Sequence, residues 1–93
     1  MKVRKFIVYY CYNEHVPCGY SGHDSVVGLA EFKPTVANVR QAVKNFFPKA
    51  EIDEKSETLK EMLRELFDYG IFSVPLVTGD HDVSESLMFN EIG

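Results

Sequence analysis

Residues 3–12 read VRKFIVYYCY, a run of β-branched and aromatic side chains without a turn residue. Such a run predicts a β-strand. Alternate residues of a strand point to opposite faces, and both faces of this one are largely apolar after its first residues. The pattern indicates either a central strand that is covered on both sides, or a sheet with one aromatic face left for a partner.

A second strand is predicted at residues 25–32, SVVGLAEF, with Gly28 as a candidate β-bulge. Residues 13–24 join the two strands, contain proline and glycine, and show no regular apolar spacing. We therefore expect a loop there, which is a long connection for a chain of 93 residues. This loop is also a candidate binding segment.

Two amphipathic helices are predicted in the middle of the chain. The first follows Thr35, a candidate N-cap, and ends before Pro48. The second follows Ser56, its expected N-cap, and ends at Gly70, which has the position of a left-handed C-terminal cap. In both helices apolar residues recur at intervals of three and four, which gives each helix one face for burial. These residues are Val36, Val39, Val43 and Phe46 in the first helix, and Leu59, Met62, Leu63, Leu66 and Phe67 in the second.

Two further strands are predicted at residues 72–78, FSVPLVT, and 83–92, VSESLMFNEI. Pro75 cannot donate a hydrogen bond to a ladder, so it predicts an edge, a bulge or a cis turn. The order ββααββ indicates a single α+β domain over residues 1–93, built as a two-layer, four-stranded sheet with two helices. This order is compatible with a β-grasp-like arrangement, and a thioredoxin-like fold is the alternative.

Composition narrows the class of protein. Hydrophobic residues make up 45% of the chain and charged residues 26%, as in an ordinary globular domain. The apolar run near the N-terminus is too short for a membrane span, and no signal-peptide cleavage site follows it. Two cysteines cannot build a disulfide framework of the secreted kind. We therefore expect a cytoplasmic protein that does not interact with a membrane.

Charge is unevenly distributed along the chain, whose formal net charge is −4. Residues 1–50 carry seven basic and three acidic groups, whereas residues 51–93 carry three basic and eleven acidic ones. A folded domain can interleave the two halves as an ordinary mixed surface. It can also present an acidic face to a basic partner, or to the basic half of a second copy. The excess of negative charge argues against binding to nucleic acid.

Cys11, His15, Cys18 and His23 are close in sequence, and thiolate and imidazole are ligands that zinc prefers. Their spacing is not a common zinc-finger pattern, and the predicted strand places Cys11 inside the sheet. The alternative is a buried thiol together with exposed loop side chains. We assign no metal or cofactor, and zinc binding by this segment remains an alternative.

The sequence CGYS at residues 18–21 resembles the active-site loop of monothiol glutaredoxins. In addition, SVP at residues 73–75 is similar to the Val-Pro turn that faces the reactive cysteine in thioredoxin-fold proteins. The resemblance covers only these two short segments. It implies a Cys18 thiolate at a helix N-terminus beside a cis proline, and thiol-redox activity. Thiol-redox chemistry is therefore the alternative function.

Aromatic side chains support the leading hypothesis. Phe6, Tyr10 and Tyr12 share one face of the first strand, and Tyr20 lies in the adjoining loop. Tyrosine combines a large contact area with a hydroxyl group and is common at recognition surfaces. If both helices pack on one face of the sheet, we expect the tyrosine-bearing face to be open, and an open apolar face usually has a partner.

We therefore expect a small, acidic, non-enzymatic protein-binding module of the inhibitor or adaptor type that phages and mobile elements encode. Its partner would be another protein, or a second copy in a homodimer. It would act through the tyrosine-rich sheet face and the loop at residues 13–24. The predicted partner-binding residues are Tyr10, Tyr12, His15, Cys18, Tyr20 and His23.

Overall fold

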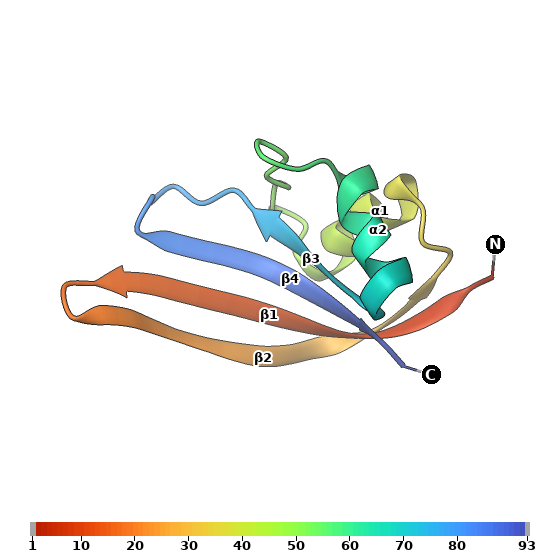
Figure 1. Cartoon of the computed structure of the whole chain (residues 1–93), viewed down its shortest axis with the longest axis horizontal. Coiled ribbons are helices and arrows are strands. Elements are labelled where there is room, and N and C mark those ends of the chain that lie inside the picture. Colours follow the sequence, from red (N-terminus) through yellow and green to blue (C-terminus); the bar gives the residue numbers. More distant parts are fainter. Residues whose placement is uncertain (1, 93) are drawn as a thin grey trace.

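The computed structural model describes residues 2–92, apart from the side chain of Tyr20, and its four strands pair into one antiparallel sheet. The strand order is β2-β1-β4-β3, and both helices lie on the same face of the sheet (Figure 1). The predicted α+β fold with the order ββααββ is confirmed. The elements are β1 at Arg4–Val16, β2 at Gly19–Phe32, α1 at Val36–Phe46, α2 at Leu59–Tyr69, β3 at Ile71–Leu76 and β4 at Val83–Glu91.

The sheet is antiparallel at each of its three pairings, β1 with β2, β1 with β4, and β3 with β4. A β-grasp sheet joins its first and last strands in parallel, and a thioredoxin-like sheet also contains parallel central strands. Neither arrangement describes this topology, in which the first and last strands run in opposite directions.

The segment at residues 13–24 is not a loop but the outer half of a long β-hairpin. β1 and β2 stay paired until Val16 lies opposite Gly19, which leaves only Pro17 and Cys18 in the turn. The loop prediction is wrong because this ribbon is exposed on both sides, so its sequence has no apolar alternation to indicate a strand. Its pairing instead continues the ladder that the apolar part of β1 begins.

Gly28 lies at a β-bulge, as predicted, because the register of β1 with β2 shifts opposite it. Its φ of 155° lies in a region that other residues rarely adopt. A Cβ atom at this position would lie 3.0 Å from Cε1 of Phe46. Glycine therefore permits both the bend in β2 and the close approach of the end of α1.

The helix ends agree with the predicted caps except at one position. Thr35 accepts a hydrogen bond from the backbone N–H of Asn38 at 3.2 Å, and Gly70 adopts a left-handed conformation after α2. The N-cap of α2 is Thr58 rather than Ser56, because Thr58 forms a reciprocal capping box with Glu61.

Within residues 2–92, neither helix is long and apolar enough to cross a membrane.

The helices cover the face of the sheet that bears Phe6 and Val8, and both of these side chains are fully buried. The expectation that this face is open is therefore wrong: Tyr10, on the same face, packs its ring against Phe47 at a centroid distance of 5.4 Å. The core consists of Phe6, Val8, Val39, Ala42, Val43, Leu59, Met62, Leu63, Leu66, Phe72, Val74, Leu76, Leu87 and Phe89.

Pro75 lies in the edge strand β3, which is one of the positions that its missing N–H predicts. Its carbonyl oxygen points away from β4 and accepts a hydrogen bond from the N–H of Asp53 at 2.8 Å. The proline nitrogen shares that outward direction, so the ladder to β4 loses no hydrogen bond. A single bridge between Ile52 and Leu76 also covers this edge.

The revised N-cap of α2 gives a direct test of the fold. We expect Thr58→Ala to lower the free energy of unfolding by about 1 kcal/mol, because it removes an acceptor for the N–H of Glu61. Ser56→Ala is the matched control and is expected to change stability by less than about 0.5 kcal/mol. Urea denaturation followed by circular dichroism measures both. A larger loss for Ser56→Ala than for Thr58→Ala would contradict the observed cap.

Candidate binding site

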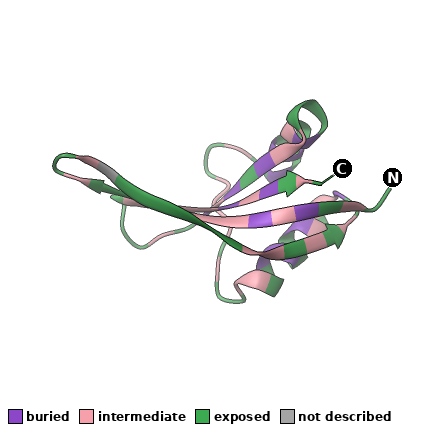
Figure 2. Ribbon diagram, turned by 90° about the horizontal axis from the view of Figure 1, so that it is seen from below, coloured by how far each residue is buried: buried purple, intermediate pink, exposed green. Residues whose placement is uncertain are grey.

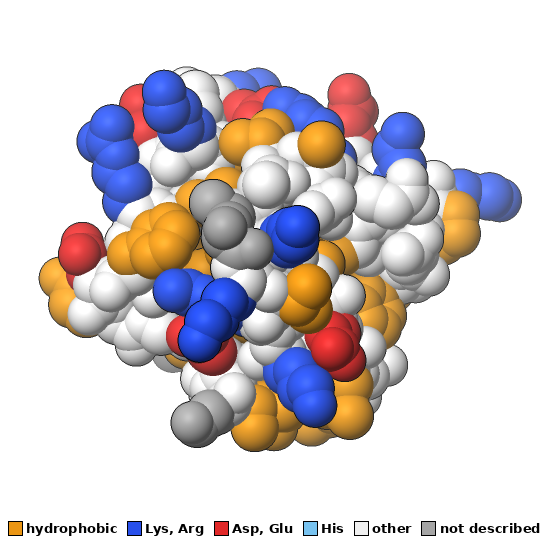
Figure 3. Space-filling view, turned by 90° about the vertical axis from the view of Figure 1, so that its right-hand side faces the viewer, with side chains coloured by type: hydrophobic (Ala, Val, Ile, Leu, Met, Phe, Trp, Pro, Cys, Tyr) orange, Lys and Arg blue, Asp and Glu red, His pale blue; other side chains and the backbone are white. Residues whose placement is uncertain are grey.

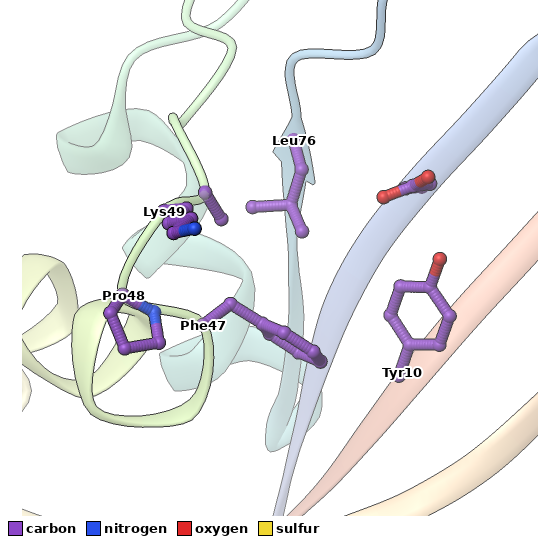
Figure 4. A pocket seen from close by; sticks show the side chains of 7 residues that line it. Tyr10, Phe47, Pro48, Lys49 and Leu76 are labelled. Atoms are coloured by element: carbon purple, nitrogen blue, oxygen red, sulfur yellow. The ribbon is translucent and has the colours of Figure 1, made fainter.

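A cavity of about 380 Å³ opens between the sheet and the segment that follows α1. Figure 4 shows Phe47 directed from that segment toward the sheet, with Tyr10 on the far side and Leu76 beside the space between them. The lining is mostly apolar, with polar groups supplied by Tyr10, Lys49 and Glu85. The full lining consists of Tyr10, Phe47, Pro48, Lys49, Ala50, Leu76 and Glu85.

The position of Phe47 follows from the end of α1. A residue that precedes proline is disfavoured in helical conformation, and Phe47 leaves the helix with φ −136° and ψ 85°. Its N–H still bonds to the carbonyl of Val43, which anchors it to the last turn. The ring therefore swings from the helix axis toward β1. A hydrogen bond of 3.0 Å from the N–H of Ala50 to the carbonyl of Phe47 closes the wall of the cavity.

Glu85 places a carboxylate on the sheet side of this cavity. Burial raises the pKa of Tyr10, and the nearby carboxylate of Glu85 raises it further. Tyr12 lies two residues along the same strand face; loss of hydration raises its pKa, with Glu14, Glu85 and Asp80 adding to the effect. Glu85 therefore acts on both tyrosines, whereas Glu14 and Asp80 act on Tyr12, which lies beside the cavity; we call these three carboxylates the acidic rim.

Tyr12 and His23 extend this surface along the hairpin. They face each other across the β1–β2 ladder, with ring centroids 5.5 Å apart and planes inclined by 32°. The Tyr12 hydroxyl also points to Oε2 of Glu14, at 3.5 Å. Because Tyr10 and Tyr12 are on the same strand face, the pocket and the Tyr12–His23 pair form one continuous side of the molecule.

The structure does not bring all the predicted binding residues together. Tyr10, Tyr12 and His23 lie on the helix side of the sheet, whereas His15 belongs to the opposite face of β1. The backbone N–H of His15 bonds to the carbonyl of Asp82 at 2.7 Å. Cys18 is exposed in the hairpin turn. The side chain of Tyr20 lies outside the described residues.

Most of the pocket was not predictable from the sequence. Its walls come from the segment after α1, from β3 and from β4, and no motif links these positions. One local signal was available: Phe47 directly precedes Pro48, which disfavours helical conformation at Phe47 and so turns it out of the helix. The contribution of Glu85 depends on strand register, which the sequence did not specify.

The cysteines and histidines do not assemble into the sites considered from sequence. Within residues 2–92 no group of three or more His, Cys, Asp or Glu side chains is arranged to hold a metal ion. Cys11 and His23 lie on opposite faces of the sheet, because Cys11 pairs with Asp24 and His23 pairs with Tyr12. The resemblance to glutaredoxins implied that Cys18 lies at a helix N-terminus. Cys18 instead lies in a hairpin turn.

The environments of the two thiols predict different reactivities. Burial raises the pKa of Cys11, and Asp24 raises it further, so at a given pH less of this thiol is the reactive thiolate. Cys18 is exposed. We expect Cys11→Ser protein to react with iodoacetamide at pH 8 about tenfold faster than Cys18→Ser protein. Mass spectrometry of timed samples measures both rates, and equal rates would contradict the shielding of Cys11.

No protein-family model matches this chain, and comparisons with curated proteins and with solved structures find no match either. The pocket, the acidic rim and the hairpin are therefore the features from which a function can be inferred.

Proposed function

We propose that this protein is a small, non-enzymatic module that binds another protein through the Tyr10 pocket and the adjoining hairpin face. The partner places an apolar side chain in the cavity and a basic group against the acidic rim. The observation that carries the proposal is the combination of an apolar cavity with negative charge on one side.

The cavity has the chemistry of a pocket for an anchoring side chain. Its volume of about 380 Å³ lies near the lower end of the range for ligand pockets, which suits a side chain rather than a large cofactor. Aromatic and aliphatic walls, here Tyr10, Phe47 and Leu76, are typical of the pockets that receive the dominant residues of protein interfaces.

The charges beside the cavity select among partners. Glu85 lines the pocket, and Glu14 and Asp80 lie close enough to affect the ionisation of Tyr12. Lys49 belongs to the wall formed by the segment after α1, on the side of the cavity away from Tyr10 (Figure 4). A basic group therefore pairs best on the sheet side. This favours the sequence-based interpretation in which an acidic face attracts a basic partner.

The hairpin enlarges the surface available to a partner. The molecule measures 45 × 26 × 24 Å, and its long dimension comes from the β1–β2 arm that projects away from the helices (Figure 1). Exposed residues predominate along the end of the arm (Figure 2). A pocket at the base of an exposed arm offers one deep contact and an adjoining flat one, as interfaces with a central anchor and a polar rim do.

The proposal gives neither cysteine a catalytic role. The pKa of Cys11 is raised by burial and by Asp24, which disfavours the thiolate. Both cysteines are free, which suits a reducing compartment, and we propose a cytoplasmic location. A module that binds a protein without reacting with it would act as an inhibitor or an adaptor.

Two short peptides test the pocket and its charge preference. We expect acetyl-Phe-Arg-amide to bind with a Kd on the order of millimolar and to shift the NMR signals of Tyr10, Phe47 and Leu76. Acetyl-Phe-Glu-amide is expected to bind about two- to fivefold more weakly, because its carboxylate meets the acidic rim. Equal binding of the two peptides, or no saturable shift at these residues, would overturn the proposal.

Variants separate the apolar and electrostatic contributions. Phe47→Ala should abolish the shifts, since it removes one wall of the cavity. Glu85→Gln should retain binding of both peptides but reduce the preference for arginine, because Glu85 is the carboxylate that lines the cavity. Asp68→Asn, an equal change of charge on the exposed side of α2, is the matched control and should leave the preference intact.

A further inference from the structure

The face of the sheet that carries no helix has an apolar centre. Val26 and Leu29 of β2 are 62% and 72% exposed, although both are large aliphatic residues. Figure 2 views the molecule from this side, and in Figure 3 hydrophobic side chains appear along the lower margin, which is the helix-free side. We call this surface the open face. Its apolar residues are Ile7, Tyr9, Val26, Leu29, Ile71 and Met88.

These side chains lie next to one another across the sheet. Ile7 lies opposite Leu29, and Tyr9 lies between Val26 on one side and Met88 on the other. The solvent face of an antiparallel sheet normally carries polar residues, in alternation with the buried ones. β1 departs from that pattern at Ile7, Tyr9 and Cys11, and both described helices pack on the other face of the sheet. We take this contiguous apolar patch as a candidate interaction surface.

Charges on the open face are confined to its two ends. Lys5 and Glu31 lie opposite each other at one end, and Asp24 lies opposite Cys11 at the other. Lys5 and Cys11 are six residues apart on β1, which is about 20 Å. Between these ends the described residues of β1–β4 place no charged side chain on this face.

We propose that a second copy of this chain covers the open face, with the Lys5 end of each copy against the Asp24 end of the other. A two-fold axis that lies between the sheets, crosses β1 at right angles and passes near Val8 produces this arrangement. Each Lys5 then stands between its own Glu31 and the Asp24 of the second copy. Such an interface is isologous, so the same contacts occur twice.

The charge pattern favours a second copy over a basic partner. The chain has a net charge of −4, but the described strands place no acidic residue at the centre of this face to repel a second copy. For the same reason the centre of the face has no acidic cluster that would attract a basic protein. The Lys5–Glu31 end meets the Asp24 end of the second copy only when the two sheets run in opposite directions. In this arrangement each copy offers Lys5 to the second copy's Asp24.

The size of the patch predicts a reversible dimer. Four strands about 4.8 Å apart and six residues at about 3.3 Å each give a footprint of roughly 300 Å² per copy. Stable interfaces bury about 800 Å² per partner, so the dimer should be weak and should depend on concentration. We expect monomers at about 5 μM and dimers at a few hundred micromolar, in sedimentation equilibrium experiments.

A mixing experiment tests the arrangement. Lys5→Glu adds a carboxylate beside Glu31 and the second copy's Asp24, so we expect at least about fivefold weaker self-association. In a mixture with Asp24→Lys protein, the carboxylate introduced in one chain meets the ammonium group introduced in the other. The second end of that mixed dimer regains its original Lys5–Asp24 pair. Fluorescently labelled Lys5→Glu protein should therefore bind Asp24→Lys protein at least about fivefold more tightly than it binds itself.

Controls make each outcome decisive. Lys60→Glu, an equal change of charge on exposed α2, should not alter association, and Leu29→Lys should abolish it by placing a charge in the apolar centre. Phe47→Ala should leave association unchanged, so failure of the pocket and failure of the dimer are distinguishable. A wild-type monomer at every concentration would overturn the proposal. So would folded Lys5→Glu protein that Asp24→Lys protein does not rescue.

Discussion

The whole arrangement depends on one aromatic cluster that joins three strands. The rings of Phe72 in β3 and Phe89 in β4 stack with centroids 4.9 Å apart and planes 4° from parallel, and Phe6 in β1 meets each of them edge-on at 6.0 Å. All three side chains are almost completely buried beneath the helices. A slip of one residue in any of these strands would turn its phenylalanine to the opposite face, so the cluster fixes the register of the sheet.

A second constraint is the difference in length between the two layers. Each helix has 11 residues and spans about 16 Å, whereas β1 has 13 residues and spans about 43 Å. The helices can therefore cover only the end of the sheet that contains Phe6 and Val8. Tyr10 lies where the helix layer ends, and Phe47 reaches it only because Pro48 stops α1. The pocket occurs at this margin, and the uncovered remainder of the sheet becomes the hairpin arm.

The strands and helices were predictable because each depends on a local pattern, and so were the caps at Thr35 and Gly70. The covered face was not predictable from β1, whose two faces are both apolar. In β4 the covered face carries Leu87 and Phe89, whereas the other face carries Ser86, Met88 and Asn90. The outer hairpin was missed because an exposed ribbon carries no apolar period. The grouping of cysteines and histidines in the sequence was misleading, since strand alternation sends neighbouring side chains to opposite faces.

β1 connects the two proposed surfaces, because its even-numbered residues face the helices and the pocket while its odd-numbered residues form the open face. Stacking two sheets through their open faces leaves both helix layers outermost. The two Tyr10 pockets of such a dimer face away from each other, so self-association and partner binding do not compete for the same residues. A dimer with two outward pockets can bridge two partner molecules, or bind twice to one partner that presents two anchors far enough apart. In the second case the gain in affinity comes from effective concentration rather than from any new contact.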